Sequence, residues 1–134
     1  MGVMVVDTSA LLAIIQNEPE SEQFLAAIRA ADRVLASAVT ILEAGTVLHA
    51  RRGTAGTDEL IDLVDGMGID VVAFDALAAH AAVDAFRTYG KGIHAQVRLN
   101  LGDCAVYALA KSMNAPLLFK GHDFAATDIA SAVR

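Results

Sequence analysis

The sequence predicts an α/β domain in which a central, mostly parallel sheet lies between two layers of helices. Short apolar runs without polar alternation, at residues 3–6 and 117–119, are typical of strands buried on both faces. These runs alternate along the chain with longer segments of helical periodicity, which is the order that a parallel sheet requires. The chain has 134 residues, and we expect them to form a single domain, 1–134.

The first third of the chain predicts two helices between two strands. Residues 8–15 follow the first strand and are expected to be a helix. Pro19 suits the first turn of a second helix, because its fixed φ is already helical. The apolar face of this second helix consists of Phe24, Leu25 and Ile28. Residues 34–36 are then expected to be a short strand.

Two more helices are expected before the middle of the chain. Residues 37–52 carry apolar side chains on successive turns, and Gly53 ends the pattern. The residues that recur on successive turns are Val39, Leu42, Thr46 or Val47, and Ala50. Residues 57–67 show a second amphipathic pattern, which Gly68 closes.

The second half of the chain repeats the alternation of strand and helix. The expected elements are a strand at 70–74, a helix at 75–89, a helix at 101–113, a strand at 117–119 and a candidate last strand at 129–133. Residues 91–100 are polar and without periodicity, which predicts a loop. Asp7 and the residues after Phe119 both follow strands, and ligands of parallel sheets bind outside the carboxyl ends of the strands.

Composition limits the classes of function. The formal net charge is −6, so nucleic acid could be bound only with the help of metal ions or a local basic patch. The apolar runs are far shorter than the ~20 residues that span a bilayer, and the N-terminus does not resemble a signal peptide. A cytoplasmic protein without a membrane partner is therefore expected. The single cysteine, Cys104, is predicted to be a buried helix thiol rather than a nucleophile.

Four acidic residues stand out because their neighbours are apolar: Asp7, Glu43, Asp103 and Asp123. Each has an ordinary explanation. Asp7 could cap a helix, Thr40 and Glu43 have the spacing of a capping box, and Asn100 with Asp103 has a similar shape. Asp123 could lie in a plain turn. Taken singly, these explanations remain open.

Taken together, the four acids predict a metal site at one edge of the sheet. Carboxylates held close together repel one another and have raised pKa values unless a cation lies between them. Oxygen ligands without supporting cysteine or clustered histidine suit Mg²⁺ or Mn²⁺ rather than Zn²⁺. Such ions activate water and can clamp the oxygens of a phosphate, so the pattern points to metal-assisted hydrolysis of phosphodiesters.

Cationic residues near the acids fit a phosphate substrate. Those that could guide a nucleic-acid backbone are Lys91, His94, Arg98 and Lys120. Arg51, Arg52 and Arg87 could do the same, or could be solubilising charges at helix ends.

Four segments of the chain resemble one known family. These are "VVDTSALLAII", "ILEAGTVL", "YGKGIHAQVRLNLGDCAVYALAK" and "PLLFKGHDFAATDI", which resemble the PIN-domain ribonucleases of the VapC toxin family in order and spacing. The resemblance covers nearly the whole chain and implies a three-layer α/β/α PIN-like fold. Ile93, Ala95 and His122 depart from the family pattern, and they affect the substrate-facing loop more than the metal ligands.

The resemblance implies an Mg²⁺- or Mn²⁺-dependent endoribonuclease, the toxin of a type II toxin–antitoxin pair. Its partners would be an RNA substrate, a VapB-type antitoxin that covers the active-site groove, and a second copy in a homodimer or higher assembly. Asp7 and Asp103 would be the primary metal ligands, with Glu43 and Asp123 as additional acids. The supporting residues would be Thr8, Ser9 and Asp128.

Two other functions are compatible with parts of the pattern. A haloacid-dehalogenase-type phosphatase also begins with a strand and an aspartate, but it normally has a second aspartate where this chain has Ser9. A catalytically weak module that binds RNA or the antitoxin would keep the fold without turnover. Metal titration with a cleavage assay distinguishes these functions.

Overall fold

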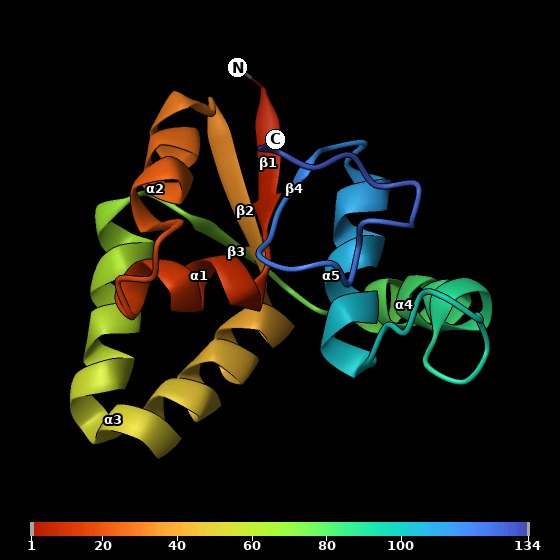
Figure 1. Cartoon of the computed structure of the whole chain (residues 1–134), viewed down its shortest axis with the longest axis horizontal. Coiled ribbons are helices and arrows are strands. Elements are labelled where there is room, and N and C mark those ends of the chain that lie inside the picture. Colours follow the sequence, from red (N-terminus) through yellow and green to blue (C-terminus); the bar gives the residue numbers. More distant parts are fainter. Residues whose placement is uncertain (1, 134) are drawn as a thin grey trace.

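Four strands form a parallel sheet at the centre of residues 2–133, the part of the chain that the computed structural model describes (Figure 1). The strands are β1 (Val3–Val6), β2 (Arg33–Ser37), β3 (Asp70–Val72) and β4 (Leu117–Leu118). Their order across the sheet is β3-β2-β1-β4, and each neighbouring pair is parallel. The predicted sheet is confirmed, and all four strands end at the same edge.

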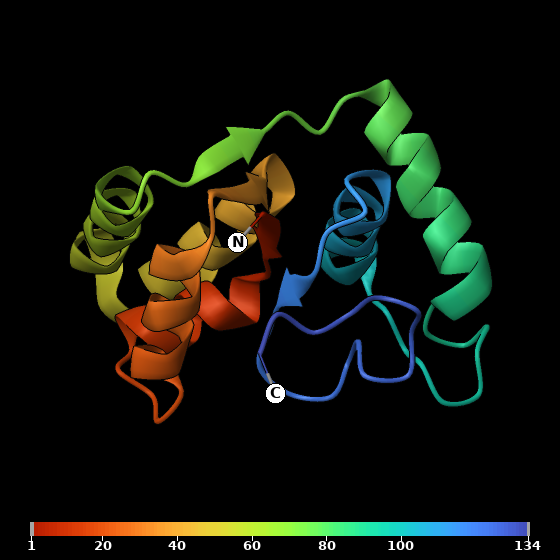
Figure 2. The same cartoon turned by 90° about the horizontal axis from the view of Figure 1, so that it is seen from above.

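Helices cover both faces of the sheet (Figures 1 and 2). One layer consists of α1 (Thr8–Ile15), α2 (Ser21–Ala30) and α3 (Ala38–Gly66), and the other of α4 (Ala76–Tyr89) and α5 (Leu101–Ser112). Side chains of β1 alternate between the layers, because Met4 and Val6 lie in the core with α1–α3 whereas Val5 packs with α5. This is the predicted three-layer α/β/α arrangement. Within residues 2–133, no helix is both long and apolar enough to cross a membrane.

The long helix α3 consists of two helical segments that meet at Gly53. Gly53 has φ 64° and ψ −152°, which interrupts the helix where the sequence predicted an end. The helical periodicity of the first segment is confirmed, but the side chains that show it are not its buried face: Leu42 is 68% exposed. The buried row is instead Thr40, Ala44 and Leu48, at four-residue spacing. It faces α1, and small side chains in this row let the two helices approach closely.

Helix caps set the beginnings of the helices near the sheet edge. Asn100 caps α5 in a capping box with Asp103, as the sequence suggested. Thr40 does not cap α3, because Ser37 at the end of β2 already accepts a hydrogen bond from the backbone N–H of Val39. Thr40 and Glu43 therefore lie inside the helix.

The larger differences from the predictions lie at three other places. Helix α2 begins at Ser21, so Pro19 lies in the preceding turn. Strand β3 ends at Val72 rather than at residue 74, and it is an exposed edge strand. Residues 129–133 form no strand; Ser131 makes a single bridge to Leu117 of β4. Each difference lies at the periphery, where fewer neighbours constrain the backbone.

Candidate active site

Asp7 lies at the carboxyl end of β1, where its backbone N–H donates to the carbonyl of Leu118 in β4 (2.9 Å). Its side chain is the N-cap of α1 and is only 5% exposed. The Oδ2 atom accepts hydrogen bonds from the backbone N–H (3.0 Å) and the hydroxyl (2.6 Å) of Ser9. The Oδ1 atom is buried and has no hydrogen-bond partner within the described residues.

Ser9 also connects Asp7 to the segment that follows β4. Its Oγ accepts a hydrogen bond from the backbone N–H of Lys120, which follows β4 (2.9 Å). Ser9 thus orients Asp7, a supporting role of the kind that the resemblance implies. Thr8 orients a different acid.

Glu43 approaches the site from the second turn of α3. Its Oε1 accepts a hydrogen bond from the hydroxyl of Thr8, the first residue of α1 (2.6 Å). The carboxylate also lies directly against Gly102 in the first turn of α5. Glu43 is therefore held between two helix N-termini, where the partial positive charge of helix ends stabilises an anion.

Asp103 lies in the first turn of α5 and is 8% exposed. Its Oδ2 accepts from the backbone N–H of Asn100 (3.1 Å), and the Asn100 side chain accepts from the N–H of Asp103 (2.9 Å). No hydrogen bond to Oδ1 is present within residues 2–133. Asp103 therefore repeats the arrangement of Asp7, with one oxygen used in a helix cap and the other left without a donor.

The pKa values of Asp103 and Asp7 respond to the acids around them. Burial, opposed by the backbone hydrogen bond from Asn100 and assisted by repulsion from the other three acids, raises the pKa of Asp103 to about 7. The pKa of Asp7 is also raised, mainly by burial and then by repulsion from Glu43, although the Ser9 hydrogen bonds oppose the shift. Asp123 is exposed in the turn after β4. The structure thus brings all four predicted acids to one edge of the sheet.

The residues present fit a hard divalent cation. No three Asp, Glu, His or Cys side chains within residues 2–133 already form a group that would hold a metal ion by themselves. An open arrangement suits Mg²⁺, which is usually bound through one or two carboxylates and keeps several water ligands. Leaving the buried Oδ1 of Asp7 without a partner costs free energy, and a cation beside it would remove that cost.

Asp128, the remaining predicted acid, lies elsewhere. Its carboxylate accepts hydrogen bonds from the Tyr107 hydroxyl and the Lys111 ammonium group, and these interactions lower its pKa. Asp128 therefore attaches the C-terminal segment to α5. The resemblance of its segment to the family pointed to Asp128 as a supporting acid, but only the fold shows that Lys111 pairs with it.

The four predicted cationic residues have different environments. Lys91 and Arg98 are exposed in the loop before α5 and form no ion pair within residues 2–133. His94 shapes this loop instead, because its Nδ1 accepts from the backbone N–H groups of Gln96 (3.1 Å) and Val97 (2.9 Å). Lys120 pairs with Glu18 (2.5 Å) and Glu20 (3.5 Å). Lys91 and Arg98 are thus the cations best placed to meet a ligand.

Two of the remaining arginines have structural contacts. Arg51 donates to the side chain of Gln16 (2.9 Å), and Arg52 pairs with Glu59 (2.6 Å). Arg52 also donates to the carbonyl of Ile15 at the end of α1 (3.4 Å). These contacts favour the explanation that both residues stabilise helix ends.

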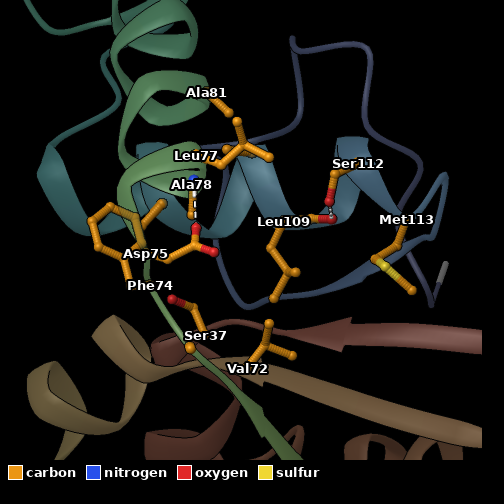
Figure 3. A pocket seen from close by; sticks show the side chains of 13 residues that line it. Ser37, Val72, Phe74, Asp75, Leu77, Ala78, Ala81, Leu109, Ser112 and Met113 are labelled. Carbon is orange, nitrogen blue, oxygen red and sulfur yellow. Dashed lines mark hydrogen bonds between the residues drawn. The ribbon is translucent and has the colours of Figure 1, made fainter.

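Figure 3 shows a cavity of about 410 Å³ between α4, α5 and the β3 side of the sheet. Its polar groups are already used within the protein: Asp75 caps α4, Ser37 caps α3, and Ser112 donates to the carbonyl of Leu109. None of the four clustered acids lines it. This cavity is therefore apart from the acidic site.

A second hollow, which we call the apolar groove, lies beside the acids. It has a volume of about 500 Å³ and is lined by Val39, Phe74, Ala79, Ala82, Val83, Phe86, Leu101, Cys104 and Ala105. Leu101 is 86% exposed and precedes Asp103 by two residues. Cys104 is buried in α5, as predicted, and burial raises its pKa to about 11.

Comparisons with known proteins agree on one family. The PIN domain model matches residues 4–130. Ribonuclease VapC30 of Mycobacterium tuberculosis is 48% identical over 128 residues, which cover 96% of this chain and 97% of the relative. Ribonuclease VapC of Mycolicibacterium smegmatis is 44% identical over 128 residues, with 96% and 98% covered.

Solved structures show the same fold at low sequence identity. VapC20 of Mycobacterium tuberculosis superposes with a TM-score of 0.80 at 16% identity, covering 98% of this chain and 99% of that one. VapBC2 of Rickettsia felis gives a TM-score of 0.74 at 11% identity, covering 96% of each chain. These likenesses concern the arrangement of strands and helices.

Proposed function

The chain belongs to the PIN domain family and, within it, to the VapC ribonucleases, and on this premise we propose that it is the endoribonuclease toxin of a type II toxin–antitoxin pair. The observation that carries the proposal is the meeting of four acids at one sheet edge, with the buried Oδ1 of Asp7 lacking a partner. The match over residues 4–130 supports a single PIN domain.

The proposed cofactor is Mg²⁺, with Mn²⁺ as a substitute. A bound ion would stabilise negative charge on phosphate oxygens and lower the pKa of a water molecule. Asp7 and Asp103 would hold the ion through their free Oδ1 atoms. Glu43, held in place by Thr8, would orient the attacking water, and Asp123 would complete the site from the turn after β4.

Backbone and side-chain donors around these acids keep them in position. Ser9 fixes one oxygen of Asp7, and Asn100 fixes one oxygen of Asp103, so neither carboxylate has to be ordered when the cation binds. Lys91 and Arg98, exposed in the loop before α5, would contact the RNA backbone. Their local charge would offset the net negative charge of the protein.

The proposed protein partner is a VapB-type antitoxin that binds at the apolar groove. Exposed apolar surface of this kind marks interaction sites, and Leu101 places the groove beside Asp103. An antitoxin segment bound there would cover the acids. The homodimer expected from the sequence stays a prediction, which light scattering of the purified chain tests.

Asp7→Asn tests the proposed chemistry. The variant should cleave RNA about 100-fold more slowly or worse, since an anionic ligand worth several kcal/mol in the transition state is lost. It should also lose most of the rise in unfolding temperature that Mn²⁺ gives the original protein, because the ion no longer binds the folded state tightly. Cleavage of total bacterial RNA and thermal unfolding with and without Mn²⁺ measure both effects.

Asp62→Asn is the matched control, because it makes the same change on an exposed position of α3. This variant should behave like the original protein in both assays. Cleavage by Asp7→Asn at the original rate would refute the mechanism. An original protein that binds RNA but never cleaves it with either ion would instead support the binding-module alternative.

A further inference from the structure

Gly102 is the second residue of α5. It directly precedes Asp103 and lies against the carboxylate of Glu43 in α3. A Cβ atom at this position would lie 2.6 Å from Oε2 of Glu43 and 2.9 Å from both its Cδ and its Oε1. All three separations are far below van der Waals contact. The Glu43 carboxylate therefore occupies the space that any other residue at position 102 would fill.

The backbone does not explain this glycine. Gly102 is not among the residues with positive φ, so its conformation is open to every amino acid. Glycine inside a helix is less favourable than alanine by roughly 0.5–1 kcal/mol. By contrast, a Cβ at Gly66, near the end of α3, would meet no atom within 4 Å. Space, rather than conformation, is what distinguishes position 102.

Glu43 cannot move aside without losing a contact. Its Oε1 is held by the Thr8 hydroxyl at 2.6 Å, while the other side of the carboxylate rests on Gly102. The obstructing atoms are the end of a flexible side chain, so a residue larger than glycine would displace Glu43 rather than unfold the protein. The displacement would move the Glu43 carboxylate relative to Asp103, the acid whose pKa is raised in part by the charge of Glu43.

We propose that Gly102 is a positioning residue: by lacking a side chain, it lets the Glu43 carboxylate rest on the first turn of α5, next to Asp103. This inference rests on the proposed function, because it concerns how the acids share a divalent cation. Gly102 has no side chain with which to bind a cation or RNA. Its role is to fix the spacing of two acids that come from different helices.

Gly102→Ala is the direct test, with Gly66→Ala as the matched control. We expect Gly102→Ala to fold, to bind Mn²⁺ about 10-fold more weakly and to lower kcat by about 10–100-fold, the range seen when side chains that orient metal ligands are changed. The KM for RNA should stay within about 2-fold, because the loop cations are untouched. Gly66→Ala should change none of these values.

A double-mutant cycle with Glu43 separates positioning from general disruption. In a Glu43→Ala background, Gly102→Ala should cause no further loss of Mn²⁺ affinity, because the side chain that it displaces is absent. Glu43→Asp, whose carboxylate is one methylene further back, should partly restore affinity to Gly102→Ala. Equal losses in both backgrounds, or no loss at all, would overturn the inference.

A metal-free readout keeps this test independent of the proposed function. The ¹³C resonance of the Glu43 carboxyl group in the metal-free protein should shift in Gly102→Ala and stay unchanged in Gly66→Ala. If the original protein neither binds Mn²⁺ nor cleaves RNA, the proposed function fails while this resonance still reports whether Gly102 positions Glu43. An unshifted resonance in Gly102→Ala would refute the positioning role.

Discussion

Asp7 and Asp103 each use one carboxylate oxygen in a helix cap, and the proposed metal site would use the other. In both, Oδ2 takes part in the cap of a helix, and the buried Oδ1 of Asp7 has no hydrogen-bond donor within the described residues. Capping would therefore not compete with the proposed metal binding, because the two would use different oxygens. The cap also restricts rotation of the side chain, which holds the free oxygen in one place.

The raised pKa of Asp103 predicts how the metal-free protein responds to pH. With a pKa of about 7 in the folded state and an ordinary value near 3.8 when unfolded, the folded protein binds more protons between these values. The free energy of unfolding should therefore fall as pH rises from about 4 to 7, by about 4 kcal/mol at most. Urea unfolding in EDTA at several pH values measures this.

Asp103→Asn should flatten that pH dependence, because asparagine does not titrate. Its side-chain oxygen can still accept the hydrogen bond from the backbone N–H of Asn100. Asp7 acts in the same direction, so some slope should remain. Asp128 does not interfere, since its lowered pKa lies below this range. An unfolding free energy with the same slope in the original protein and in Asp103→Asn would contradict the assignment.

At the level of elements, the bend of α3 depends on one glycine (Figure 1). Gly53 has φ 64° and ψ −152°, a region that residues with a Cβ rarely adopt. The bend lets the first segment pack against α1 and still carries the chain to β3. Local backbone freedom thus decides how this layer of helices is arranged.

Gly53→Ala should destabilise the protein by about 1–3 kcal/mol, the usual cost of forcing a side chain into such a conformation. No atom lies within 4 Å of a Cβ built at this position, so the cost is backbone strain and not a clash. Gly66→Ala in the same helix should be neutral or stabilising by up to about 1 kcal/mol. Equal changes in the urea midpoints of Gly53→Ala and Gly66→Ala would show that the bend does not need glycine at position 53.

At the level of the whole molecule, α4 separates two apolar hollows. Val83, 51% exposed, lines the apolar groove next to the acids, whereas Leu77, 80% exposed, lines the cavity of Figure 3. An antitoxin that covers the acids would use the first hollow. The two residues offer matched positions on one helix for testing which side the partner contacts.

Val83→Glu should weaken binding of the coexpressed antitoxin by about 10-fold or more, because a charge would be buried in an apolar contact. Leu77→Glu should change this affinity by less than about 2-fold. RNA cleavage by the free toxin should remain unchanged in both variants. Calorimetric titration measures the affinities, and equal losses in the two variants would place the partner elsewhere.

Local signals explain why much of the fold was predictable. Buried strands such as β1 are continuous apolar runs, and caps such as Asn100 and interruptions such as Gly53 are encoded by one to four neighbouring residues. The buried face of α3 was not predictable in this way. Its row contains Thr40 and Ala44, while the more apolar Leu42 faces outward, because the choice depends on the surface of α1.

The sequence alone determined the strand–helix order, the family and the identity of the acids, because each depends on residue types at fixed spacing. Only the tertiary structure decided that Asp128 is neutralised by Lys111, that His94 shapes its loop and that Lys120 pairs with Glu18. It also decided that Gly102 makes room for Glu43. These facts depend on distances between segments far apart in the chain, which only the packing of helices on the sheet establishes.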